Sequence, residues 1–110
     1  MGTPFEDMAE IDRLVHDPSR LAISSALLSC ESADFLFLQR LTGLSKGNLS
    51  SHLSKLERGG VVAIEKTPSG RSRTTVSLTD VGRKTVSDHW DRLVRLRNAA
   101  EEWTNPEPSE

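Results

Sequence analysis

Residues 41–60 decide the fold, and they read LTGLSKGNLSSHLSKLERGG. Leu49, Leu53 and Leu56 recur at three- and four-residue spacings, which predicts a helix from Lys46 to Arg58 with one apolar stripe. Ser45 stands where a side-chain oxygen caps such a helix, and two glycines follow its last residue. The stretch therefore predicts an amphipathic helix with a buried side and a solvent-facing side.

The side opposite the leucines is small, polar and free of carboxylates. No acidic residue stands between Lys46 and Leu56, whereas a merely solvated helix face usually mixes both signs. Serine, asparagine and lysine side chains can contact phosphates and base edges, and a glycine lets another backbone approach closely. The candidate DNA-reading residues are Ser45, Lys46, Gly47, Asn48, Ser50, Ser51, Ser54 and Lys55.

The preceding residues predict three more helices. Phe5–His16 and Ser19–Cys30 carry apolar residues at helical spacing, and Asp17-Pro18 separates them as a cap and a first helical position. Asp34 is placed to cap a short helix over Phe35–Leu41, which the turn Thr42-Gly43-Leu44 joins to the helix described above. Two helices joined in this way form a helix-turn-helix, whose second helix can lie in the DNA major groove.

A period of two replaces the helical period after Gly60. Val61–Lys66 and Arg71–Leu78 flank the turn Thr67-Pro68-Ser69-Gly70, which predicts a β-hairpin with a basic tip. Behind a helix-turn-helix, such a hairpin is expected to act as a wing whose basic side chains contact phosphates and the minor groove. The candidate wing residues are Lys66, Arg71 and Arg73, with Arg71 at the tip.

A last helix is predicted over Asp80–Trp103, too long for one small core to bury. A second copy of the chain is the simplest cover for its apolar stripe and for that of the first helix. The candidate dimer residues are Met8, Ile11, Leu14, Val15, Val86, Trp90, Leu93, Leu96, Ala100 and Trp103. The alternative is that the stripe folds back on its own domain. Residues 1–103 are expected to form one DNA-binding and dimerisation domain, and residues 104–110 a disordered tail.

The charge of the chain is sorted into blocks. Its net charge of −2 and pI of about 5.9 would argue against a nucleic-acid partner, but both values are averages over the whole chain. Residues 39–75 carry seven basic and two acidic side chains, a net charge of +5, and residues 1–38 carry a net charge of −5. The basic block covers the turn, the reading helix and the hairpin.

Three segments together resemble winged-helix transcriptional regulators of the ArsR/MarR type. Their recognition segment is matched by Leu41–Ser45, Asn48–Glu57 and Gly60–Val62. Arg73–Arg83 resembles their wing strand and the start of their last helix, and His16–Ile23 resembles the opening of their core helix. The resemblance spans about residues 11–95 and implies a winged helix-turn-helix, mainly α with five helices and a two-stranded wing. It also implies a homodimer that binds a pseudo-palindromic operator, usually as a repressor.

Departures from these relatives argue against metal sensing. Phe35–Leu41 contains no cysteine, and Asp88-His89 has no second histidine downstream, so neither ligand set of the ArsR metal sensors is matched. His16, His52 and His89 stand on separate elements without ligand spacing, and His52 is expected to pack at the edge of the core. Cys30 is expected to behave as a small buried hydrophobe rather than as a redox switch. We expect no metal, no cofactor and no enzymatic activity.

The sequence therefore predicts a cytoplasmic, homodimeric regulator that binds double-stranded DNA and no membrane. No apolar run approaches the roughly 20 residues that a membrane-spanning helix needs. One alternative is a winged helix that docks an acidic protein through its basic face. Another adds a small-molecule effector, of unidentified chemistry, at the dimer interface between the first and last helices.

Overall fold

The computed structural model describes residues 13–68 and 73–104, and within these ranges the predicted winged helix is confirmed. Of the predicted first helix the structure describes residues 13–16, which are helical, and the first helix means these four residues from here on. The elements that follow are α2 (Pro18–Leu28), β1 (Ala33–Asp34), α3 (Phe35–Thr42), α4 (Lys46–Arg58), β2 (Val62–Thr67), β3 (Arg73–Leu78) and α5 (Asp80–Thr104). Of the predicted tail, Thr104 belongs to α5, and residues 105–110 lie outside the described part.

Each of the four complete helices begins at a side-chain cap that the sequence predicted. The cap oxygen accepts hydrogen bonds of 2.8–3.1 Å from backbone amides of the first helical turn, which have no partner within the helix. The caps are Asp17 for α2, Asp34 for α3, Ser45 for α4 and Thr79 for α5.

The turn between α3 and α4 depends on a glycine. Gly43 ends α3 with a φ of 70°, in the left-handed region that side chains with a Cβ rarely adopt, and its amide donates to the carbonyl of Gln39 at 2.8 Å. The Thr42 hydroxyl accepts from the amide of Leu44 at 3.3 Å. These bonds fix the direction in which the chain enters α4.

The sheet has three strands in the order β1-β3-β2, where the sequence predicted two. Ala33 pairs with Val76 and Asp34 with Thr75, both antiparallel. A strand of two residues is too short to show an alternating pattern, so the sequence revealed only the capping role of Asp34. The added strand ties the start of α3 to the base of the wing.

The apolar core takes residues from every described element and is centred on the leucine stripe of α4. Leu49, Leu53 and Leu56 are at most 2% exposed. They belong to one cluster with buried residues of α2, α3 and the sheet, namely Ile23, Leu27, Leu38, Val62 and Val76. Burial of three leucines on one side fixes the rotation of α4 and turns its polar side outward.

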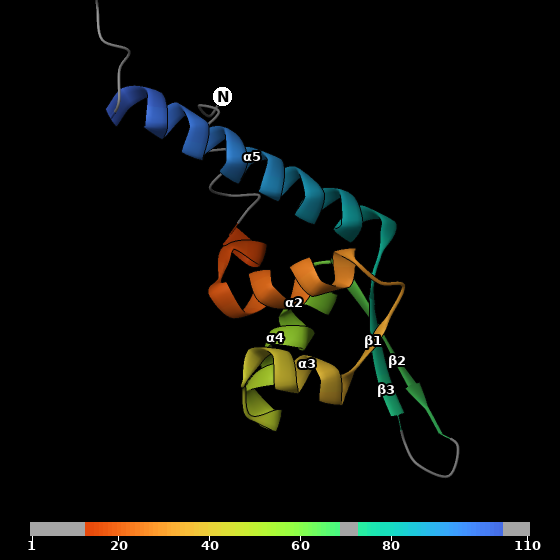
Figure 1. The fold of residues 1–110 in the computed structure, drawn as a ribbon. Helices are drawn as coiled ribbons and strands as arrows, with labels where there is room; N and C mark the ends of the chain where they lie inside the picture. The colour runs from red at the N-terminus through yellow and green to blue at the C-terminus, as the bar shows by residue number, and fades with distance from the viewer. Residues whose placement is uncertain (1–12, 69–72, 105–110) are drawn as a thin grey trace, which may run out of the picture.

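The long helix α5 lies across one end of the molecule, and α3 and α4 lie toward the other, where the wing also points (Figure 1). The first half of α5 packs on the core through Val86 and His89, which are 0% and 2% exposed. Every residue from Val94 to Trp103 is exposed. The second half of α5 therefore extends past the core of its own chain.

The start of α5 approaches the turn after α4 so closely that only glycine fits at position 82. A Cβ on Gly82 would overlap the carbonyl of Val61, whereas a Cβ on Gly47, in the first turn of α4, would meet no heavy atom within 4 Å.

We expect Gly82→Ala to lower the free energy of unfolding by about 2–3 kcal/mol, because the backbone of one element must shift. Gly47→Ala should change it by at most about 0.5 kcal/mol. Urea unfolding of both variants, followed by tryptophan fluorescence at one protein concentration, measures the difference. Equal stabilities would contradict the close packing of α5 on Val61.

Candidate nucleic-acid interface

The outward side of α4 and its cap Ser45 together carry all eight residues that the sequence proposed for DNA reading, and every one is exposed. They are Ser45, Lys46, Gly47, Asn48, Ser50, Ser51, Ser54 and Lys55. The three leucines of the same helix point the opposite way into the core. The structure thus brings the eight residues onto one continuous helical surface, which we call the α4 face.

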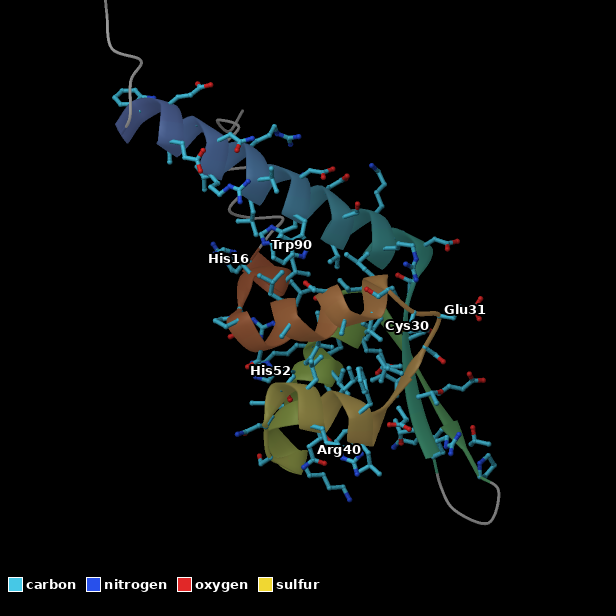
Figure 2. The ribbon with its side chains drawn as sticks, in the orientation of Figure 1. His16, Cys30, Glu31, Arg40, His52 and Trp90 are labelled. Atoms are coloured by element: carbon cyan, nitrogen blue, oxygen red, sulfur yellow. The ribbon has the colours of Figure 1, made fainter. Side chains whose placement is uncertain are left out.

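The electrostatics of α4 favour an anionic partner. Its first turn contains no acidic residue, so the partial positive charge of the helix N-terminus is reinforced by Lys46 rather than neutralised. The space around Gly47 is open, which leaves room for a second backbone to approach. Arg40 of α3 is exposed at the same end of the molecule, which Figure 2 shows.

The strand register separates the two described wing cations. Lys66 pairs with Thr74, and Arg73 pairs with Thr67, so their side chains lie on opposite faces of the ribbon. Lys66 shares its face with the core residue Val62, whereas Arg73 lies on the outer face. The wing therefore presents cations on both sides of a narrow ribbon, and Arg71, the proposed tip residue, lies outside the described residues.

His52 packs at the edge of the core, as the sequence predicted, and it has partners that the sequence did not reveal. Its Nδ1 lies 3.2 Å from Nη1 of Arg20 and 4.0 Å from Oδ1 of Asp17. Arg20 also donates from Nε to the carbonyl of Leu14 at 2.6 Å. These contacts join α4 to the junction between the first helix and α2.

The structure also brings together two histidines that are 73 positions apart. Nδ1 of His16 lies 3.3 Å from Nε2 of His89, and the rings meet edge to face with centroids 5.3 Å apart. Sequence spacing gave no signal for this pair. Within residues 13–68 and 73–104, no group of three or more histidine, cysteine or carboxylate side chains is arranged to hold a metal ion.

The proposed dimer residues divide into four groups. Val15 and Val86 are fully buried in the core of their own chain, so the sequence assigned them to the wrong surface. Leu14 and Leu93 are half-buried, and Met8 and Ile11 lie outside the described residues. The exposed members are Trp90, Leu96, Ala100 and Trp103.

Trp90 and Cys30 each make a polar contact within their own chain. Trp90 donates from its indole nitrogen to Ser25 of α2 at 2.8 Å, which anchors the middle of α5. Cys30 lies just beyond α2, where it is half-buried against the core and its thiol contacts the carbonyl of Ala26 at 3.5 Å.

The chain belongs to the family described as the winged helix DNA-binding domain, whose model matches residues 19–96. This is a family of DNA-binding transcriptional regulators rather than enzymes, as the sequence predicted. In the part of the chain that the structure describes, none of the helices combines the length and the hydrophobicity that spanning a membrane requires.

Three proteins are similar to this chain over most of its length. An uncharacterized protein of Methanocaldococcus jannaschii is 32% identical over 78 residues, which cover 70% of this chain and 85% of that protein. A transcriptional regulator homologue from Pyrococcus horikoshii OT3 superposes with a TM-score of 0.80 at 33% identity, over 87% of this chain and 98% of its own. A protein assigned to the MarR family of transcriptional regulators, from Enterococcus faecalis V583, has a TM-score of 0.72 at 18% identity, over 94% and 91% of the two chains, and shows the same fold.

The pKa of the Asp17 carboxyl, which caps α2, is lowered. Burial raises its pKa, but the hydrogen bonds from the amides of Arg20 and Ser19, the charge of Arg20 and the charge of His52 when it is protonated together lower the pKa by more, so it lies below its ordinary value of 3.8. The unfolded chain therefore binds this proton first as the pH falls, and the stabilisation by the charged Asp17 is present above pH 3.8 and lost below it.

We expect Asp17→Asn, which keeps a capping side chain but removes the charge, to lower the free energy of unfolding by about 0.5–1 kcal/mol at pH 7. The difference from the unsubstituted chain should disappear as the pH falls below 3.8. Urea unfolding of both proteins between pH 3 and pH 7 measures it, and a difference independent of pH would contradict the role of the charge.

Proposed function

We propose that the chain is a sequence-specific repressor that binds a pseudo-palindromic operator as a homodimer, with the α4 face in the major groove. The observation that carries the proposal is the α4 face itself: eight exposed small, polar or cationic residues opposite a buried leucine stripe. The 13 residues of α4 span about 20 Å, and a B-DNA major groove about 12 Å wide admits such a helix.

The residues of the α4 face suit different parts of the duplex. Asn48 can pair with the edge of adenine, and the serines can contact either bases or phosphates. Lys46 and Lys55 can reach phosphate or guanine. The wing adds cations beside the groove, with Arg71 as the residue we propose for the minor groove and Lys66 and Arg73 for the flanking phosphates.

We propose further that a second copy covers the outer half of α5. The direction in which Val86 and His89 face the core continues along the helix as Leu93, Leu96 and Trp103. Leu96 and Trp103 are 57% and 87% exposed. A two-fold interface there would present two α4 faces to half-sites about 34 Å apart. The small-molecule effector, if the protein binds one, is proposed to bind at this same interface.

Selection of genomic fragments by the purified chain, followed by sequencing, tests the DNA-binding proposal. On the selected operator, Lys55→Ala should weaken binding to all sequences alike and reduce the salt slope by about one, because one phosphate contact is lost. Asn48→Ala should instead relax the preference at one base position, at a cost of about 1–3 kcal/mol. Fluorescence anisotropy between 50 and 200 mM salt measures both effects.

Lys84→Ala is the matched control, because Lys84 is an exposed cation on α5 that pairs with Asp88 at 3.1 Å, away from α4. Its affinity and salt slope should equal those of the unsubstituted chain. A chain that selects no fragment, yet retains one acidic protein after nuclease treatment, would contradict the proposal and favour a protein-interaction module.

For the dimer, we expect Leu96→Glu to weaken self-association at least about a hundredfold, because it places a charge in an apolar interface. Val81→Glu is the control, since Val81 is also an exposed apolar residue of α5, 68% exposed, but lies in its first turn. Sedimentation equilibrium measures both dissociation constants. An unsubstituted chain that is monomeric at micromolar concentration would refute the dimer.

A further inference from the structure

Arg20 of α2 connects the first helix to α4. Its Nε donates to the carbonyl of Leu14 at 2.6 Å, and its Nη1 lies 3.2 Å from Nδ1 of His52. One planar guanidinium therefore holds an acceptor on each of two helices that are distant in sequence. Asp17 caps α2 at the amide of Arg20 and fixes the backbone from which the side chain extends.

The chemistry of the pair determines which ring nitrogen of a neutral His52 carries the proton. A guanidinium has five N–H donors and no acceptor, so Nδ1 of His52 accepts and the ring proton of the neutral histidine is on Nε2. The rigid fork of arginine reaches both acceptors at once, which a lysine ammonium does not reproduce.

A second contact joins the same two helices at the end of α4. The side chain of Leu14 packs over Gly59, where a Cβ would overlap it. The first helix thus meets α4 at two points, through the carbonyl of Leu14 by way of Arg20 and through the side chain of Leu14 directly. A rotation of α4 about its axis requires the contact at His52 to break.

The turn after α4 is held from the other side by α5. The carbonyl of Val61 accepts from the amide of Thr79 at 3.0 Å and lies directly against Gly82. The α4 helix therefore ends between the first helix and α5, the two elements to which the sequence assigned the dimer.

We propose that Arg20 is a positioning residue for DNA recognition, which sets the rotation of the α4 face relative to the first helix by holding His52. This inference rests on the proposed DNA-binding function of α4. In this proposal Arg20 acts through His52 and contacts no base itself. Loss of the contact reduces discrimination between sequences and leaves general attraction to phosphate unchanged.

Arg20→Lys tests this proposal, because it keeps the charge and removes the fork. We expect its affinity for the selected operator to fall about tenfold while its affinity for unrelated DNA at the same salt stays the same. Arg83→Lys is the matched control: Arg83 also bridges two carbonyls, those of Leu28 and Cys30, at 3.1 and 3.4 Å, but does not touch α4. Its ratio of specific to non-specific affinity should stay within about twofold of the original.

Two substitutions of His52 separate positioning from a direct DNA contact. His52→Asn places an acceptor near the position of Nδ1 and should preserve the ratio of specific to non-specific affinity. His52→Gln reaches toward the position of Nε2 and should lower this ratio as Arg20→Lys does. Preservation by Gln with loss by Asn would overturn the proposal, because it would show that His52 acts through Nε2. An unchanged ratio in Arg20→Lys, or an equal fall in Arg83→Lys, would also overturn it.

A measurement without DNA distinguishes failure of this inference from failure of the proposed function. Nitrogen-15 NMR of the free protein should show His52 with its proton on Nε2, and Arg20→Lys should shift the backbone amides of α4 more than Arg83→Lys does. A proton on Nδ1 in the neutral ring overturns the inference, whatever the protein binds. An unsubstituted chain with this tautomer and no preference for any fragment would instead overturn the proposed function.

Discussion

Burial of the α4 leucine stripe is the constraint on which the rest of the structure depends. Leu49, Leu53 and Leu56 can enter the core only if α4 has one rotation about its axis. That rotation exposes the serines, lysines and Asn48 of the opposite side together. The same apolar contacts that stabilise the domain therefore also determine which polar side chains α4 presents to solvent.

Polar contacts complete what burial leaves undetermined. A stripe of leucines limits the rotation of a helix but tolerates small adjustments, whereas a guanidinium with acceptors on two helices accepts a narrow range of geometry. Arg20 supplies this contact along α4, and the close approaches at Gly59 and Gly82 restrict its end. Of the two helices that frame α4, α5 carries apolar side chains beyond the core, among them Leu96 and Trp103.

The charge of the chain has functional meaning only by region. The net charge of −2 conceals a block of +5 over residues 39–75, and the fold places much of that block on the α4 face and the wing. The positions of the cations within the wing depend on the pairing register of β2 and β3, because neighbouring residues of a strand face opposite sides of the sheet. Lys66 and Arg73 consequently flank the ribbon instead of forming one cluster.

The sequence by itself determined the caps at Asp17, Asp34, Ser45 and Thr79, the buried stripe of α4 and its polar face, because each follows from a rule that acts within a few residues. Only the tertiary structure decided the pairing of Ala33–Asp34 with β3, the Arg20–His52 contact and the burial of Val15 and Val86. Periodicity shows that a side chain is on an apolar face but not what covers it, so the sequence assigned both valines to a dimer surface. Contacts between residues far apart leave no local pattern, since they depend on how the elements pack.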